Sequence, residues 1–226
     1  CFWTEQLLLS FNCIQPWKAQ CFYPDFPHDV VCGDSWGDNR LILAAEAGAF
    51  LLEEGVIHRP IFDRTVQIKQ VNVVEEHGIL IFRADKGKDS RIYVFSLSDF
   101  DSETRESGGV RNKSDLRDHR LEKTKGCHLY AISRPCDSHL RMVVAFGRRL
   151  LVFQWRHTAA WCASLDTDTV DGFQFIRELP VSEPVQLITL VDSPIKDADN
   201  QICVAYKHQF DLVNEKNGDT LTLHFC

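Results

Sequence analysis

Short apolar runs alternate with polar turns along most of the chain. Val, Ile, Leu, Phe and Tyr dominate the runs, whereas Gly, Asp and Asn mark the breaks between them. Runs of this kind, bounded by turn residues, are typical of β-strands. Helical periodicity is weak: the best helix candidate, Thr4 to Cys13, does not keep a 3.6-residue spacing and is soon followed by Pro16. The pattern therefore predicts an all-β protein.

Pairs of apolar runs joined by short polar links predict four β-hairpins. The pairs are 41–46 with 48–52, 78–83 with 91–97, 140–146 with 149–155, and 201–206 with 209–213. Further strands are predicted at 65–74, 126–133 and 185–192. The hairpins recur at about 40 to 60 residues, which is the period of propeller blades. Because one blade cannot bury both faces of its sheet alone, the repeat predicts blades stacked in a β-propeller.

The segment from Ser98 to Lys125 departs from this pattern. It is rich in Ser, Asp, Glu, Arg and Lys and has few apolar residues before Leu116 and Leu121. Such a composition predicts a mobile insertion between blades, around 98–125. Residues 28–226 are expected to form the propeller, and residues 1–27 to be an N-terminal extension or its first strands.

Composition and charge narrow the classes of partner and compartment. The chain has 226 residues, a formal net charge of -7 and nine cysteines. An acidic chain lacks the electrostatic footprint of a nucleic-acid-binding protein. The longest apolar runs are too short to span a bilayer, and the N-terminus lacks the basic region of a signal peptide. The cysteines are odd in number, scattered and without a C-x-x-C pair, which predicts a reducing, cytoplasmic compartment.

One segment matches a catalytic motif. Residues 33–37 read Gly-Asp-Ser-Trp-Gly and fit the G-x-S-x-G nucleophile elbow, which requires a strand before the serine and a helix after it. A strand-type run follows instead, and no segment offers a matching His and acid. We therefore expect a turn that buries Trp36, with a serine hydrolase acting through Ser35 as the alternative. No pattern predicts a metal site, a cofactor or another catalytic residue.

Arginines provide the candidate protein-binding residues. Arg148 and Arg149 lie at a predicted hairpin tip, and Arg156 follows Trp155. Arg and Trp are enriched at interface hot spots, so these three arginines are candidate contacts. The alternative is that they only solubilise the tip.

Several segments, in order, resemble citron homology domains. The stretch 31–37, ending in Trp-Gly, and the hairpin 41–48 resemble the opening blade of that family. Gly126-Cys127 before a strand, and the hairpin 143–155 ending in Gln154-Trp155, are also similar to it. Near the fourth hairpin the family's Gly-x-x-x-Gly-Phe pattern is incomplete, although Phe210 and Asp211 are present. The resemblance covers residues 28–225.

The resemblance implies a fold and a non-catalytic role. Citron homology domains are seven-bladed β-propellers that bind small GTPases or other signalling proteins. A complete domain is longer than this chain, so about four to five blades are expected, and closure of the ring is in doubt. Residues 34–38 resemble the Rap-GAP-like branch more than the Ste20-kinase branch, which implies Rap-type small GTPases as partners. A Rap-GAP catalytic domain carries its Asn on a helix, so that activity would lie outside this chain.

Overall fold

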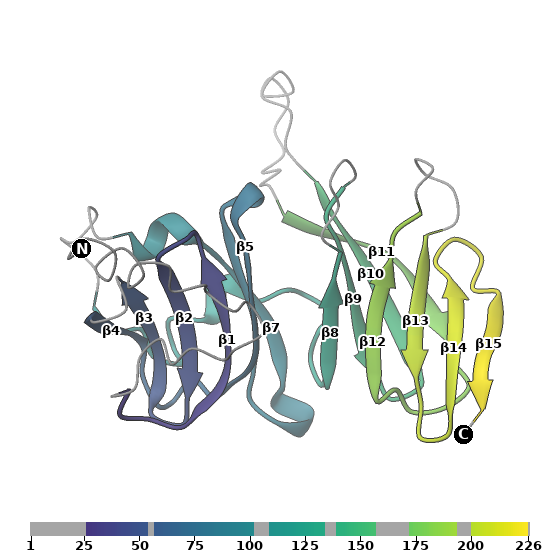
Figure 1. Cartoon of the computed structure of the whole chain (residues 1–226), viewed down its shortest axis with the longest axis horizontal. Helices are drawn as coiled ribbons and strands as arrows, with labels where there is room; N and C mark the ends of the chain where they lie inside the picture. Colours follow the sequence, from purple (N-terminus) through teal and green to yellow (C-terminus); the bar gives the residue numbers. More distant parts are fainter. Residues whose placement is uncertain are drawn as a thin grey trace, which may run out of the picture.

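The chain forms a series of antiparallel sheets that follow one another in chain order (Figure 1). The computed structural model describes residues 26–53, 57–101, 109–133, 139–156, 172–193 and 200–225, so the helix candidate at 4–13 lies outside the described residues. The helical elements of the described part are short 3-10 turns. Nothing helical in that part is long and apolar enough for a transmembrane span. The predicted all-β fold is confirmed.

Each sheet is a meander in which consecutive strands pair. Sheet 1 contains β1 (Val30–Trp36), β2 (Arg40–Ala45), β3 (Gly48–Glu53) and β4 (Ile57–Phe62). Sheet 2 contains β5 (Ile68–Val74), β6 (Ile79–Ala84) and β7 (Arg91–Ser96). Sheet 3 contains β8 (Leu129–Ile132), β9 (Arg141–Phe146), β10 (Arg149–Arg156) and β11 (Gly172–Pro180). Sheet 4 contains β12 (Leu187–Val191), β13 (Gln201–Ala205), β14 (Gln209–Asn214) and β15 (Thr220–Phe225). The 3-10 turns are η1 (Glu75–His77), η2 (Gly87–Asp89), η3 (Leu97–Phe100) and η5 (Arg117–His119).

The four predicted hairpins are the central pairs of these sheets. They are β2–β3, β6–β7, β9–β10 and β13–β14, and the runs predicted to precede the last three are β5, β8 and β12. Sequence patterning located them because a strand with apolar residues on both faces reads as a continuous apolar run. The predicted blades are therefore present as four sheets.

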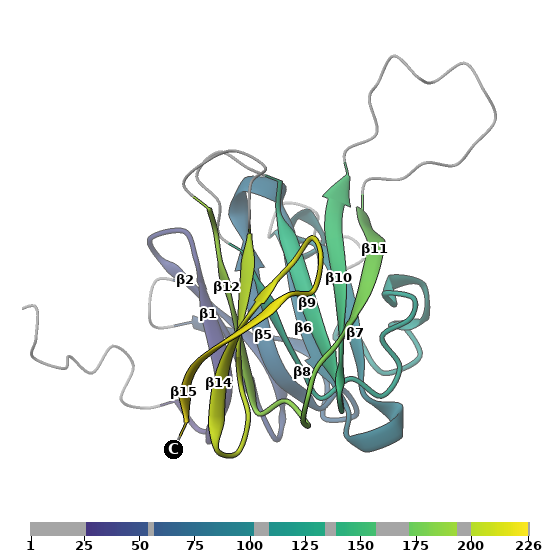
Figure 2. The same ribbon diagram turned by 90° about the vertical axis from the view of Figure 1, so that its right-hand side faces the viewer.

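The sheets stack face to face, and a separate apolar core fills each gap. Trp36 and Leu51 of sheet 1 share a core with Phe82 of sheet 2. Ile81 of sheet 2 packs into a second core with Phe153 of sheet 3, and a third core lies between sheets 3 and 4. In Figure 2 the sheets lie one behind another in this order. Each inner sheet thus buries both of its faces.

The stack is open at sheet 4. Sheets 1 and 4 lie at opposite ends of the row in Figure 1. Large apolar side chains on sheet 4 remain exposed, with Leu187 at 61%, Leu221 at 63% and Phe210 at 38%. The described residues therefore form an open row of four blades, in agreement with the expected incomplete set.

The described parts of the segment 98–125 line the outer edges of sheets 1 and 2. Arg111 bridges to Phe62 of β4, and the backbone N–H of Leu121 donates to Ile92 O of β7 at 2.9 Å. Phe100 and Leu116 are buried in the core between these sheets. We call the described part of this charge-rich segment the strap, and it packs against the propeller beside the three-stranded sheet 2. The mobility of the segment in solution stays a prediction.

Arg141 forms a polar link between sheets 3 and 4. Its guanidinium, at the start of β9, pairs with Asp192 after β12 and with Glu215 after β14. The Arg141 side chain is only 6% exposed, and burial lowers its pKa while Asp192 opposes that shift. Two carboxylates on one buried cation fix the position of sheet 4 against sheet 3.

We expect Phe82→Ala to lower the free energy of unfolding by about 3–5 kcal/mol, because it leaves a cavity in a tightly packed core. Phe82 is fully buried, and its ring stacks on those of Tyr93 and Phe95. The matched control is Phe210→Ala on the exposed face of sheet 4, which should change stability by less than about 1 kcal/mol. Urea unfolding followed by tryptophan fluorescence measures both, and equal losses would contradict the described packing.

We expect Arg141→Met to cost up to about 3–5 kcal/mol, because it leaves two carboxylates without their cation in a partly buried site. The control is Arg149→Met, since Arg149 pairs with Glu178 at 3.3 Å on an exposed surface, where an ion pair contributes about 0–1 kcal/mol. Thermal unfolding of the two variants makes the comparison. A melting temperature of Arg141→Met equal to that of Arg149→Met would show that the link between sheets 3 and 4 is not stabilising.

Candidate protein-interaction site

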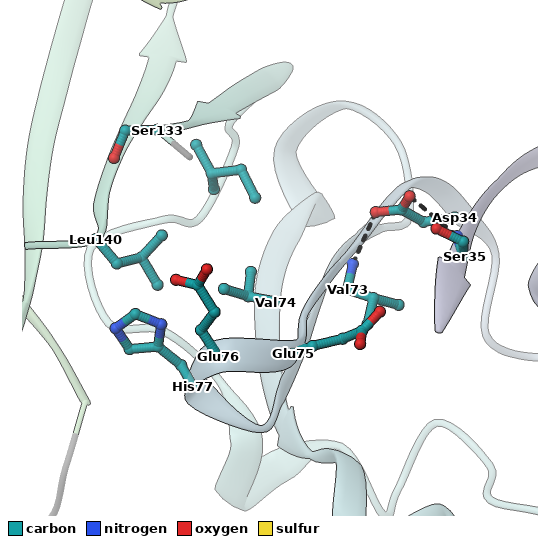
Figure 3. Close-up of a pocket in the computed structure, with 10 residues that line it drawn as sticks. Asp34, Ser35, Val73, Val74, Glu75, Glu76, His77, Ser133 and Leu140 are labelled. Atoms are coloured by element: carbon teal, nitrogen blue, oxygen red, sulfur yellow. Dashed lines mark hydrogen bonds between the residues drawn. The ribbon is translucent and has the colours of Figure 1, made fainter. Parts of the chain in front are cut away.

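A cavity of about 350 Å³ opens where the first strands of three sheets end (Figure 3). β1, β5 and β8 are the first strands of sheets 1, 2 and 3, and their C-terminal ends line this cavity. We call this end of the stack the cavity end; the turns β2–β3, β6–β7 and β9–β10 lie at the opposite end. Val73, Val74, Ile132 and Leu140 provide apolar lining, and Glu76, His77 and Ser133 provide polar groups. An apolar hollow with a few polar groups is the usual form of a binding site.

Two carboxylates of the cavity hold sheets 1 and 2 together. Asp34 Oδ2 accepts the backbone N–H of Val73 at 2.9 Å, as the dashed line in Figure 3 shows. Glu75 Oε1 accepts the backbone N–H of Gly37 at 2.6 Å. Both carboxylates are therefore engaged as acceptors between neighbouring blades, which is a structural role.

Trp36 ends β1, directly after Asp34 and Ser35 of the cavity lining, and Gly37 begins the turn that follows. Trp36 is 5% exposed, and the Arg40 guanidinium lies 3.6 Å above its ring. Gly37 has φ +65° and leads through the turn 37–39 directly into β2. The predicted turn and the burial of Trp36 are confirmed, with Trp36 at the strand end directly before the turn. Since a strand follows, the segment lacks the strand-to-helix geometry of a nucleophile elbow.

Ser35 has no catalytic partner in the part of the chain that the structure describes. Its hydroxyl makes no hydrogen bond there, although its backbone N–H donates to Asp34 Oδ1 at 3.0 Å. His77 also lines the cavity, but Figure 3 places it on the far side from Ser35, beyond Val73 and Val74. A serine nucleophile requires a base within hydrogen-bond reach, so this arrangement gives no support to a hydrolase.

Cys32 and Cys127 are the described cysteines with perturbed thiols. Desolvation by burial raises the pKa of both, and the positive charge of Arg83 only partly opposes this. Thiolates are thus scarce at neutral pH, unlike those of catalytic cysteines. Over the described ranges, no three His, Cys, Asp or Glu side chains converge in a way that could hold a metal ion.

The three candidate arginines do not form one cluster. Arg148 lies in the β9–β10 turn, and Arg149 begins β10 at the end opposite the cavity. Arg156 ends the same strand, at the cavity end, so about 23 Å of extended chain separates it from Arg149. The predicted hairpin tip is confirmed, whereas protein binding by these residues stays a prediction.

Sequence reasoning missed the polar residues that build this region. Asp34 and Glu75 contact backbone groups 39 and 38 residues away in the chain, and no local pattern predicts such partners. Arg141 carried a signal, because it is a charged residue at the start of an apolar strand. A charge in that position is generally paired when it is buried.

Comparison with known proteins identifies the family. Residues 37–225 match the CNH domain family, CNH standing for citron homology. This chain therefore belongs to the CNH domain family, which comprises protein-interaction domains. The resemblance inferred from residues 28–225 is confirmed.

Relatives and a solved structure agree with that assignment. The chain is 46% identical over 226 residues to the chicken (Gallus gallus) GTPase-activating Rap/Ran-GAP domain-like protein 3 and 42% identical over 217 residues to the human (Homo sapiens) protein of that name. These matches cover 98% and 93% of this chain but only 24% and 21% of the relatives, so the chain spans less than a quarter of their length. The AfRom2 CNH domain superimposes with a TM-score of 0.57 at 15% identity, covering 86% of this chain and 54% of that one. The latter match supports the propeller fold.

We expect Trp36→Ala to lower the free energy of unfolding by about 3–5 kcal/mol, because it removes a large buried aromatic side chain. Ser35→Ala should leave stability unchanged, since its hydroxyl is exposed and makes no hydrogen bond to a described residue. Thermal unfolding and labelling by a serine-reactive fluorophosphonate probe test both variants. Labelling that disappears in Ser35→Ala, with Trp36→Ala folding normally, would support the hydrolase instead.

Gly37→Val should also destabilise the protein, by about 1–3 kcal/mol, because a β-branched residue is strained at positive φ. A Cβ at Gly37 would meet no atom within 4 Å, so the penalty comes from the backbone and not from collision. Gly37→Asn is the matched control, since Asn tolerates the left-handed region. Equal melting temperatures for the two variants would contradict the described turn.

Proposed function

We propose that this chain is a non-catalytic docking domain in small-GTPase signalling, with Rap-type GTPases as partners, and that it works in the cytoplasm as part of a larger GTPase-regulating protein. The observation that carries the proposal is the 42–46% identity to relatives named GTPase-activating Rap/Ran-GAP domain-like protein 3. The CNH family match supports the docking role, since the family comprises protein-interaction domains.

We assign docking to the cavity end of the propeller. The cavity combines an apolar floor with exposed polar groups at its rim, and rigid strands from three sheets hold it in place. Binding residues on turns positioned by a rigid scaffold are a common arrangement in proteins. Arg156 lies at the same end, which makes it the preferred contact among the three candidate arginines.

The rival function is enzymatic. A Rap-GAP catalytic domain carries its catalytic Asn on a helix, whereas the helical elements of the described residues are short 3-10 turns. We therefore assign GTPase activation to a segment of a longer parent protein outside this chain. Hydrolysis through Ser35 is disfavoured because its hydroxyl makes no hydrogen bond to a described residue and because His77 lies across the cavity.

The test is capture of Rap-type GTPases by the immobilised chain, with each GTPase loaded with GDP or with a non-hydrolysable GTP analogue. We expect capture that depends on the nucleotide and that falls about tenfold in Glu76→Arg, because a reversed charge at the rim opposes a partner matched to that surface. Failure of both nucleotide states to bind would refute the GTPase partner.

Matched substitutions at the opposite end identify the docking surface. Glu46→Arg makes the same charge change in the exposed β2–β3 turn and should leave capture unaltered. Likewise Arg156→Ala should weaken capture, whereas Arg148→Ala should not. Weaker capture by Glu46→Arg and Arg148→Ala alone would place docking at the end opposite the cavity.

A further inference from the structure

A second hollow, of about 580 Å³, lies at the end of the stack opposite the cavity. We call it the basic hollow. Its lining comes from β5, from the end of β6, from the β6–β7 turn and from the residues before β8. The lining residues are Lys69, Arg83, Lys86, Gly87, Lys88, Gly126, Cys127 and His128. Four of these eight are Lys or Arg and none is acidic, in a chain that carries more carboxylates than cations.

The cations of the basic hollow lack compensating carboxylates. Within the described part of the chain, Lys69, Lys86 and Lys88 take part in no ion pair. Asp85, next to Lys86 in sequence, is engaged elsewhere, because it pairs with Lys113 at 2.8 Å. The hollow therefore concentrates unneutralised positive charge.

Arg83 brings a half-buried cation to this group. Its Nη1 lies 3.4 Å from Ser90 Oγ, and its buried Nε has no hydrogen-bond partner among the described residues. Its charge also acts on the thiols of Cys32 and Cys127, which lie in sheet 1 and before sheet 3. A partly buried guanidinium without an anion is unfavourable, and a bound anion would supply the missing partner.

A smaller hollow of about 300 Å³ continues the surface beyond residue 125. Lys125 lines this smaller hollow, and the next residue, Gly126, lines the basic hollow. Phe146 and Phe175 contribute aromatic surface, and Lys123 Nζ lies 3.9 Å from the centre of the Phe175 ring. A cationic site thus adjoins an aromatic one, so an extended segment could place an anion in the first and an apolar side chain in the second.

We propose that the basic hollow binds a phosphorylated serine or threonine in an extended segment of a partner protein. Clustered Lys and Arg side chains are the usual means of holding a phosphate group. Nucleic acid is disfavoured by the net charge of -7. A bilayer is disfavoured because the same end also exposes the carboxylates of Glu46, Glu122 and Glu183, which an anionic membrane would repel. This proposal is independent of GTPase docking at the cavity end.

The test uses a library of random peptides with one fixed central phosphoserine, incubated with the immobilised chain, and mass spectrometry of the peptides retained. We expect retention about tenfold above that of the same library with unmodified serine, and enrichment of apolar residues on one side of the phosphoserine. Retention should fall as salt rises and should be competed by inorganic phosphate, because the contacts are electrostatic. Equal retention of both libraries, or no retention, would overturn the proposal.

Charge-matched variants locate the site. Lys86→Glu combined with Lys88→Glu should abolish the preference for phosphopeptides. Lys207→Glu combined with Lys216→Glu makes the same change in net charge on exposed turns of sheet 4 and should preserve it. All four lysines are exposed, so thermal unfolding should show that both variants fold. Equal loss in both variants would overturn the proposal, as would binding confined to vesicles of phosphatidylcholine, phosphatidylserine and phosphatidylinositol bisphosphate.

Discussion

Burial of both faces of each β-sheet is the constraint on which the rest of this structure depends. Sheets 2 and 3 have apolar side chains on both faces, and neither face is buried unless another sheet packs on it. Stacking satisfies this need, and it places the first strands of successive sheets beside one another. The cavity lies where β1, β5 and β8 end together. The basic hollow lies at the opposite end, where the start of β5, the β6–β7 turn and the residues before β8 meet.

The fold was largely predictable because its determinants are local. The hairpin 141–153 is visible in the sequence as two apolar runs separated by one turn. The turn after Trp36 is likewise indicated by the adjacent Gly37. The contacts between blades were not predictable in this way. Tyr130 donates its hydroxyl to Ile81 O, and Gln70 bonds the Tyr130 backbone, across 49 and 60 residues of chain. Composition alone also did not indicate that Phe100 and Leu116 of the strap are buried in the core between sheets 1 and 2.

The two ends of the stack differ in chemical character. The cavity end has acidic groups engaged in holding sheets 1 and 2 together, beside an apolar floor. The opposite end has the basic hollow, whose three lysines form no ion pair with a described residue. A rigid stack can present both surfaces at once, because neither depends on a rearrangement of the sheets.

The strap over sheet 2 has a consequence for solubility. A three-stranded sheet ends in an edge strand, and an open edge invites pairing with a strand of another molecule. The strap occupies part of that edge: the backbone N–H of Leu121 donates to Ile92 O of β7, and Arg120 forms a β-bridge with Tyr93. Its backbone thus pairs with β7 at Ile92 and Tyr93, where an open edge could otherwise pair with another molecule. The strap, whose composition is typical of a mobile insertion, therefore limits edge-to-edge association at sheet 2.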